Sequence, residues 1–200
     1  MNSKARPWWQ NLSRWILKRV GWQLVDKAPP TSRYVLIGAH HTSNWDWAVG
    51  FLMMSGLGLK PRWIGKDALF KGVAGPIMRW LGGIPVVRGA RANFVGQIAE
   101  VYTNSKELVI AIAPEGTRKY VDHWKSGFYH IASEAKVSIA MGFLDYQKKI
   151  CGIGGHLLPS GDIKADMEIL REFYAGVVAK FPENQGIVRL ASKTSAKSIV

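Results

Sequence analysis

The chain has 200 residues, a length that suits one compact domain with a sizeable core. Its formal net charge of +13 indicates a surface that attracts anions, but the sequence carries no zinc-finger spacing and no RNP-like stretch, so we expect no nucleic-acid partner. The single cysteine, Cys151, excludes an internal disulfide and favours a reducing compartment, where we expect it to be a buried, small apolar residue.

The first expected element is an amphipathic helix over 8–24. Its broad apolar face holds Trp8, Trp9, Leu12, Trp15, Ile16, Val20 and Trp22, and its opposite face holds Gln10, Asn11, Arg14 and Lys18. Such a Trp-edged face with cations behind it suits a helix that lies in the plane of a membrane surface. The alternative, that this helix packs on its own domain and its cations are simply solvated, stays open.

Neither a cleaved leader nor a spanning helix is expected. Polar and charged residues interrupt the N-terminal stretch, so it lacks the apolar centre of a signal peptide, and we expect a cytoplasmic chain. The longest uncharged run, residues 47–59, would extend only about 20 Å as a helix, against roughly 30 Å of hydrocarbon in a bilayer.

After Pro29 and Pro30 the chain alternates strand-like and helix-like runs. We expect strands near 33–38, 61–65, 84–87, 107–113, 137–144 and 149–153, and helices near 44–57, 74–82, 91–104, 126–135 and 163–181. The last helix is expected to be capped by Asp162 and to bury Met167, Leu170, Tyr174, Val177 and Phe181 along one stripe. This order predicts a single α/β domain with a largely parallel central sheet flanked by helices, with the last two strands paired as a hairpin. The domain is expected over 29–185, preceded by the surface helix in 1–28 and followed by a tail over 186–200.

Two polar clusters follow apolar strand-like runs. His41 and Asp46 come after 34–37, and the segment Pro114-Glu115-Gly116-Thr117-Arg118 comes after 108–113. An imidazole beside a carboxylate can act as an oriented general base. Because the carboxyl ends of parallel strands meet at one edge of a sheet, we expect both clusters to border one cleft.

These clusters resemble the ordered motifs of the glycerolipid acyltransferases, the family that includes lysophosphatidic acid acyltransferase. His41 to Asp46 is similar to the H-x-x-x-x-D block, 83–88 (Gly-Ile-Pro-Val-Val-Arg) to the second block, and Pro114 to Arg118 to the P-E-G-T-R block. The resemblance extends over roughly 34–146. One departure is the fourth block, which in the family has the pattern V-P-I-V-P and here reads Val137-Ser138-Ile139-Ala140-Met141; we expect the strand to remain, while the identity of the acyl acceptor stays open.

The resemblance implies that a fatty acyl chain moves from acyl-CoA or an acyl-carrier protein to the hydroxyl of a lysolipid, with neither metal nor cofactor. His41 is then the general base and Asp46 fixes its tautomer, while His40 is expected to be a packed or hydrogen-bonded support residue. The implied substrate-binding residues are Arg88, Glu115, Gly116, Thr117 and Arg118, with the two guanidinium groups suited to an acceptor phosphate. Transfer is expected to be direct, because the sequence has no G-x-S-x-G nucleophile segment.

Other functions are open from the sequence. A metal-dependent hydrolase would use His40, His41, Asp46, His123 and His130, although the sequence has neither the H-E-x-x-H spacing nor a pair of cysteines. A basic membrane-surface module without catalysis would explain the first helix and the charge, but not the two polar clusters. Among acceptors, 1-acylglycerol-3-phosphate, another lysophospholipid and a phosphate-free lysolipid all remain candidates, and we expect the enzyme to work peripherally at the cytoplasmic side of a membrane.

Overall fold

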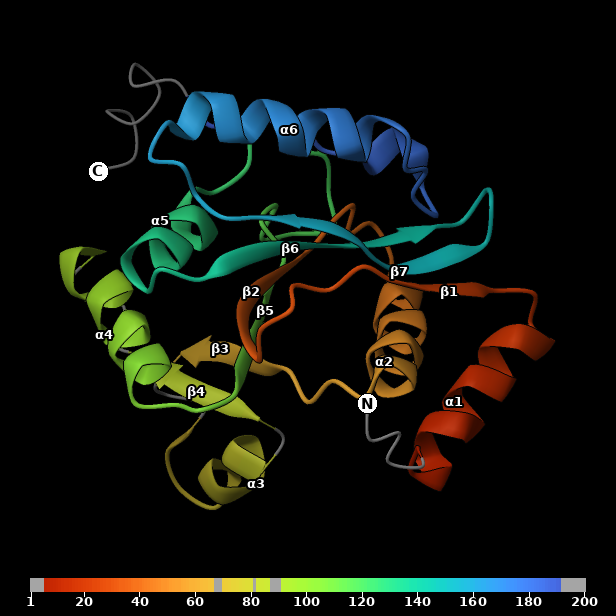
Figure 1. Ribbon diagram of the computed structural model, residues 1–200, viewed down its shortest axis with the longest axis horizontal. Coiled ribbons are helices and arrows are strands. Elements are labelled where there is room, and N and C mark those ends of the chain that lie inside the picture. The colour runs from red at the N-terminus through yellow and green to blue at the C-terminus, as the bar shows by residue number, and fades with distance from the viewer. Residues whose placement is uncertain (1–5, 67–69, 81, 87–90, 192–200) are drawn as a thin grey trace.

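The computed structural model describes residues 6–66, 70–80, 82–86 and 91–191, and a twisted sheet lies at its centre (Figure 1). The elements in chain order are α1 (Trp8–Arg19), β1 (Gln23–Asp26), β2 (Arg33–Gly38), α2 (Trp45–Leu57), β3 (Arg62–Lys66), α3 (Ala74–Trp80), β4 (Gly83–Val86), α4 (Arg91–Thr103), β5 (Leu108–Ile112), α5 (Gly127–Glu134), β6 (Ser138–Asp145), β7 (Ile150–Leu157), α6 (Ile163–Ala175) and the short 3-10 helix η2 (Pro182–Asn184).

The described strands form one seven-stranded sheet in the order β1-β7-β6-β2-β5-β3-β4. All neighbouring pairs are parallel except β6 and β7, which form the expected antiparallel hairpin. This arrangement confirms the predicted α/β fold with a largely parallel central sheet. Figure 1 shows α6 above the sheet and α1, α2 and α3 below it.

Alternating side chains of the central strand β2 supply cores on both faces of the sheet. Val35 and Ile37 point into the larger core, which α4, α5 and α6 cover. Tyr34 and Leu36 point to the other face, where they pack with residues of α2. A strand that is buried on both faces reads as a continuous apolar run, which is why this segment was predictable from the sequence.

The first helix ends earlier than predicted, so the expected helix over 8–24 is wrong for its last residues. α1 ends at Arg19, and Gly21 takes a left-handed conformation with φ of 82°. The backbone N–H of Gln23 then donates to the carbonyl of Lys149, which starts the parallel pairing of β1 with β7. Trp22, which was expected on the apolar face of the helix, instead follows it and is buried in a cluster with Leu17 and Met53.

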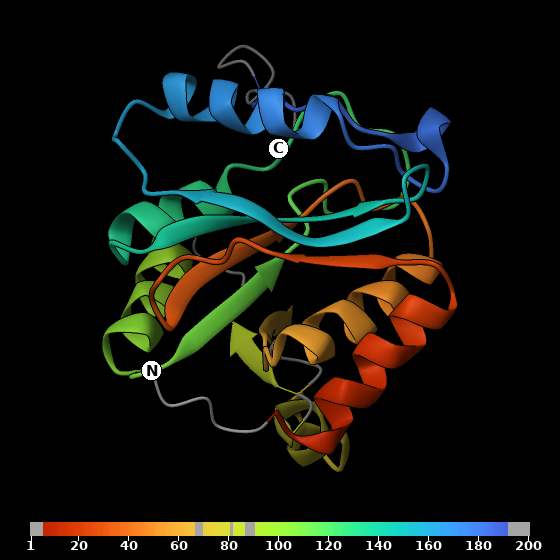
Figure 2. The ribbon, with the colours of Figure 1, turned by 45° about the vertical axis from the view of Figure 1, so that its right-hand side comes forward.

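α1 packs against α2 (Figure 2). The hydroxyl groups of Ser13 and Ser55 are 2.7 Å apart, and the Nε of Arg14 donates to the carbonyl of Gly56 at 2.7 Å. Arg14 was predicted on the solvated face of the helix, and this contact makes that part of the prediction wrong. The polar edge of α1 faces the domain, and the Trp-rich edge is left outside.

The last helix is also shorter than the predicted 163–181. Asp162 caps it as expected, accepting from the N–H groups of Lys164 and Ala165. The helix ends at Ala175, and the following residues pass the ends of β6 and β2, where Val178 accepts from the backbone N–H of Tyr146 and Phe181 donates to the hydroxyl of Thr42. Phe181 therefore leaves the predicted buried stripe and is 41% exposed.

The altered fourth block remains a strand, as predicted. Residues 138–142 pair in parallel with β2 at the centre of the sheet, and Ile139 and Ala140 are fully buried. Cys151 on β7 is likewise fully buried, and this burial raises the pKa of its thiol to about 12. In the segment predicted as a tail, Leu190 forms a bridge with Trp124, so ordered structure reaches at least that residue.

Candidate active site

Three neighbouring parallel strands deliver polar side chains to one edge of the sheet. β2 leads into His41, β5 leads into Glu115, and β6 leads into Tyr146. The order β6-β2-β5 makes these strands direct neighbours, and their carboxyl ends meet at the same edge. The structure therefore brings together the two clusters that the sequence placed at separate strand ends.

His41 and Asp46 form a hydrogen-bonded pair. His41 Nδ1 lies 3.0 Å from Asp46 Oδ2, and because a carboxylate only accepts hydrogen bonds, the proton resides on Nδ1 and the lone pair on Nε2. The His41 side chain is 33% exposed and that of Asp46 only 5%. The pair thus consists of a partly exposed imidazole and a buried carboxylate.

Asp46 is held by donors on both oxygens. The backbone N–H groups of Thr42 and Ser43 donate to Oδ2, each at 2.8 Å, and the hydroxyl of Tyr146 donates to Oδ1, also at 2.8 Å. Burial alone would raise the pKa of Asp46, but these hydrogen bonds and the one from His41 outweigh burial and bring this pKa below its usual value. The position of Asp46 in the first turn of α2 also favours the ionised carboxylate.

Glu115 contacts both histidines that follow β2 and holds this segment in place. Its Oε1 lies 3.1 Å from His40 Nδ1, and its Oε2 accepts the backbone N–H of His41 at 2.7 Å. The side chains of His40 and Glu115 are almost completely buried, and the ring of Tyr174 packs edge-on against His40 at 5.9 Å. This geometry gives His40 the supporting position that was expected, and it engages both carboxylate oxygens of Glu115 within the protein.

A pocket of about 510 Å³ opens beside Glu115. It is lined by Glu115, Gly116, Thr117, Tyr120, Val121, Asp122, His123 and Lys125. Gly116 has φ of 69°, and a Cβ at this position would lie 2.6 Å from the Nζ of Lys125. The positive φ favours glycine here, and the close approach of Lys125 places an ammonium group over the turn.

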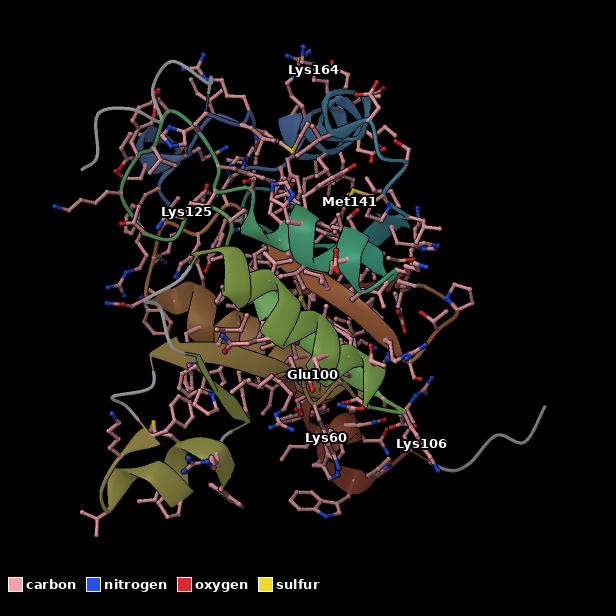
Figure 3. The ribbon with its side chains drawn as sticks, turned by 90° about the vertical axis from the view of Figure 1, so that its left-hand side faces the viewer. Lys60, Glu100, Lys106, Lys125, Met141 and Lys164 are labelled. Carbon is pink, nitrogen blue, oxygen red and sulfur yellow. The ribbon has the colours of Figure 1, made fainter. Side chains whose placement is uncertain are left out.

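A second pocket, of about 780 Å³, lies at the other end of the strands. It is lined by 30–33 and 103–106, which flank the amino ends of β2 and β5. Figure 3 shows Lys125 of the first pocket and Lys106 of the second far apart on the molecule. Neither pocket is lined by His41 or Asp46, but the first is lined by Glu115, whose carboxylate accepts the backbone N–H of His41, so the first is the candidate substrate site.

The other predicted site residues occupy different surroundings. Thr117 is exposed and lines the pocket, Arg118 is exposed and follows it in the chain, and Arg88 lies outside the described residues. The histidines that a metal site would need are dispersed: His123 Nδ1 pairs with Asp122 at 2.6 Å, and His130 is exposed on α5. Across the described ranges, no three His, Cys, Asp or Glu side chains form a group that could hold a metal ion.

Two residues of the site were not identified from the sequence. Neither Lys125 nor Tyr146 was predicted to be a site residue. The signal that could have found Tyr146 is its place directly after a predicted strand, at the edge where the other strand ends carry His41 and Glu115.

Large apolar side chains are exposed on the three helices below the sheet in Figure 1. One tryptophan on each helix is at least 74% exposed: Trp8 on α1, Trp47 on α2 and Trp80 on α3. Further exposed apolar residues on or beside these helices are Leu12, Trp15, Val20, Trp45, Phe51, Val73 and Ile77. No helix in the described part of the chain is both long and apolar enough to span a bilayer.

Comparison with known proteins adds a family and a fold. A family model described as Acyltransferase matches residues 12–141, which include His41, Asp46 and Glu115. The solved structure of the 1-acyl-sn-glycerophosphate (LPA) acyltransferase PlsC from Thermotoga maritima is similar in fold, with a TM-score of 0.52 and 16% sequence identity over 86% of this chain and 80% of that one. A search of curated proteins finds no match to the sequence.

Proposed function

Because this chain belongs to the acyltransferase family, we propose that it moves a fatty acyl chain from acyl-CoA or an acyl-carrier protein to the hydroxyl group of a lysolipid. The family match confirms the prediction of an acyltransferase enzyme. The observation that carries the finer proposal is the 3.0 Å contact between His41 Nδ1 and Asp46 Oδ2, which leaves the accessible Nε2 free to accept a proton.

The proposed reaction needs no covalent enzyme intermediate. Nε2 of His41 takes the proton of the acceptor hydroxyl as its oxygen attacks the thioester carbonyl carbon, and the carbon–sulfur bond then breaks. The departing sulfur receives the proton from the imidazolium, which regenerates the neutral ring. Throughout, Asp46 keeps the Nδ1 proton in place and stabilises the transient positive charge.

The proposed acceptor is 1-acylglycerol-3-phosphate. The pocket beside Glu115 contains the ammonium of Lys125, and Arg118 follows the same turn, so cations are available for a phosphate. We assign Arg88 to the same phosphate on the basis of the second block. The similar solved structure is named for action on 1-acyl-sn-glycerophosphate, which supports this choice.

The proposed place of work is the cytoplasmic surface of a membrane, with the enzyme bound peripherally. Exposed Trp8, Trp47 and Trp80 offer amphipathic rings that suit the boundary between headgroups and acyl chains. The net charge of +13 adds attraction to anionic lipids. A surface-bound enzyme would meet its acceptor within the bilayer that holds it.

An acceptor panel tests the chemistry. The purified protein is given one acyl-CoA and one acyl-carrier donor with 1-acylglycerol-3-phosphate, a second lysophospholipid and a monoacylglycerol, and the products are measured by lipid mass spectrometry. We expect His41→Ala to abolish transfer and His156→Ala, which removes an exposed imidazole on β7, to leave it unchanged. Full transfer by the His41→Ala protein would refute the proposed base.

A charge substitution tests the phosphate. Arg118→Gln is expected to raise KM for 1-acylglycerol-3-phosphate about tenfold or more, because a charge-assisted hydrogen bond contributes roughly 1.5–3 kcal/mol. KM for the monoacylglycerol should not change. Lys164→Gln on α6, which removes the same charge far from the pocket (Figure 3), is the matched control. Equal KM changes for both acceptors would favour the phosphate-free lysolipid.

Vesicle flotation tests the membrane surface. We expect the protein to float with vesicles that contain anionic phospholipid, and a Trp8→Ser, Trp47→Ser, Trp80→Ser variant to remain in solution. Ile169→Ser changes an exposed apolar residue on α6, on the other side of the sheet, and should have no effect. If the triple variant floats as well as the parent protein, the proposed membrane contact of these three helices is refuted.

A further inference from the structure

Tyr146 is the one side chain besides His41 that donates a hydrogen bond to Asp46 among the contacts described for that carboxylate. The two backbone donors, Thr42 and Ser43, both bind Oδ2, the oxygen that also faces the imidazole. The hydroxyl of Tyr146 reaches Oδ1 from a different strand end, 100 residues away in the sequence. It therefore fixes the oxygen that the local turn leaves without a backbone donor.

The ring of Tyr146 is held from several sides. Trp22 packs edge-on against it with ring centroids 5.1 Å apart, and the ammonium of Lys180 lies 5.5 Å from its centroid. The backbone N–H of Tyr146 donates to the carbonyl of Val178 at 2.9 Å. A tyrosine anchored by both its backbone and its ring can hold a partner in a fixed position, because little freedom of its own remains.

We propose that Tyr146 is a positioning residue that locks the carboxylate of Asp46 in the orientation His41 requires. Because hydrogen bonds hold both carboxylate oxygens, the carboxylate cannot rotate about its bond to Cβ, and Oδ2 stays directed at Nδ1 of His41. The proposal deepens the proposed acyl transfer and rests on it for its kinetic consequences. Its structural consequence, a fixed His41–Asp46 hydrogen bond, does not depend on the reaction.

Tyr146 does not act as an acid or a base in this arrangement. Burial and the neighbouring Asp46 raise the pKa of its hydroxyl far above the usual value, so it stays protonated and serves as a donor. The hydroxyl is also engaged with Oδ1, whereas the reactive nitrogen of His41 lies on the opposite side of the imidazole from Asp46. Its effect on the reaction passes through the carboxylate.

The chain contains a matched control for the loss of such a bond. Tyr129 donates from its hydroxyl to Asp166 Oδ2 at 2.7 Å, a buried bond between a tyrosine and an aspartate that joins α5 to α6. Tyr146→Phe and Tyr129→Phe remove the same atom from the same kind of hydrogen bond. Only the first touches the catalytic pair.

The kinetic test compares these variants in the full-length protein. We expect Tyr146→Phe to lower kcat about three- to tenfold, the factor that corresponds to one hydrogen bond, with KM within about twofold of the parent. Tyr129→Phe should retain the parent kcat per folded molecule. In an Asp46→Ala background, which has no carboxylate to hold, Tyr146→Phe should produce no comparable further loss. An unchanged kcat, equal losses in both tyrosine variants, or the same factor in the Ala background would overturn the proposal.

A spectroscopic test separates this inference from the proposed reaction. If the parent protein transfers no acyl group to any acceptor, the proposed function fails, but the proton on His41 Nδ1 remains observable by NMR and is assigned by its loss in His41→Ala. We expect this resonance to shift or broaden in Tyr146→Phe and to stay in place in Tyr129→Phe. An unmoved resonance in Tyr146→Phe would show that Tyr146 does not position Asp46.

Discussion

Replacing Asp46 by asparagine separates the charge of the carboxylate from its geometry. The N–H groups of Thr42 and Ser43 both point at Oδ2. An asparagine side chain must therefore place its carbonyl oxygen at that position, since its NH2 group would meet two donors there. The oxygen still accepts from His41 Nδ1, so the tautomer survives, and the new NH2 group lies beside Tyr146, whose hydroxyl can accept.

The expected loss follows from the change in hydrogen-bond strength. A bond to a charged acceptor contributes about 1.5–3 kcal/mol and a neutral one about 0.5–1.5 kcal/mol, so the imidazolium loses about 1–2 kcal/mol of stabilisation. At about 1.4 kcal/mol for each factor of ten, kcat should fall about 5- to 30-fold. A triad in which asparagine enforces the wrong tautomer loses about 10⁴-fold, so the two cases are separable.

Steady-state kinetics with saturating donor and acceptor measure this factor, and thermal unfolding checks that the variant is folded. Asp46→Ala is the companion variant, because it leaves the two backbone donors and the Tyr146 hydroxyl without their acceptor and should also lower stability by about 1–3 kcal/mol. An Asp46→Asn protein with the kcat of the parent would refute the electrostatic role. A loss near 10⁴-fold would refute the inference that the turn preserves the tautomer.

Four further results are expected. Because the pKa of Asp46 is lower in the folded than in the unfolded chain, its ionised carboxylate stabilises the fold above about pH 4, and this stabilisation is lost as the pH falls through the folded-state pKa. In urea titrations, the difference in stability between the parent and Asp46→Asn should therefore shrink in acid. Glu115→Gln places an NH2 group against one of two donors, either His40 Nδ1 or the backbone N–H of His41, and should lower the free energy of unfolding by about 1–3 kcal/mol in the same titration. Its kcat should also fall, because the backbone of His41 is held less firmly. Cys151 should resist a thiol reagent at pH 8 in the native protein and react at once in denaturant, whereas rapid native labelling would contradict its burial. Gly116→Ala should lower the melting temperature by an amount equivalent to about 1–2 kcal/mol, since φ there is 69°, and an unchanged melting temperature would contradict this conformation.

The contact between His41 and Asp46 was predictable because the two residues are close in sequence. His41 and Asp46 are five residues apart, and a turn after a buried strand brings them together through local geometry. The partners that hold this turn are distant: Glu115 bonds to His40 across 75 residues, and Tyr146 bonds to Asp46 across 100. Spacing within a motif carries no information about contacts that depend on which strands become neighbours.

The sheet was predictable in its centre and not at its edge. The buried apolar run of β2 is distinctive on its own, whereas β1 has only four residues, and their side chains continue the apolar pattern of the preceding helix. Only the parallel pairing of Gln23–Asp26 with residues 150–153 of β7 makes this segment a strand. The same limit applies to Arg14, because a cation on a helix surface gives no sign that a carbonyl of another helix lies within reach.

The pairing of β1 with β7 has a consequence for any shortened form of this protein. Without the first 28 residues, β7 would become an edge strand with unpaired backbone groups along 150–153, and such an edge can pair with a strand of another molecule. The apolar cluster around Leu144 and Cys151 would lose Leu17 and Trp22 at the same time. The N-terminal segment thus covers this edge of the sheet, and truncating it to improve solubility should instead produce aggregates.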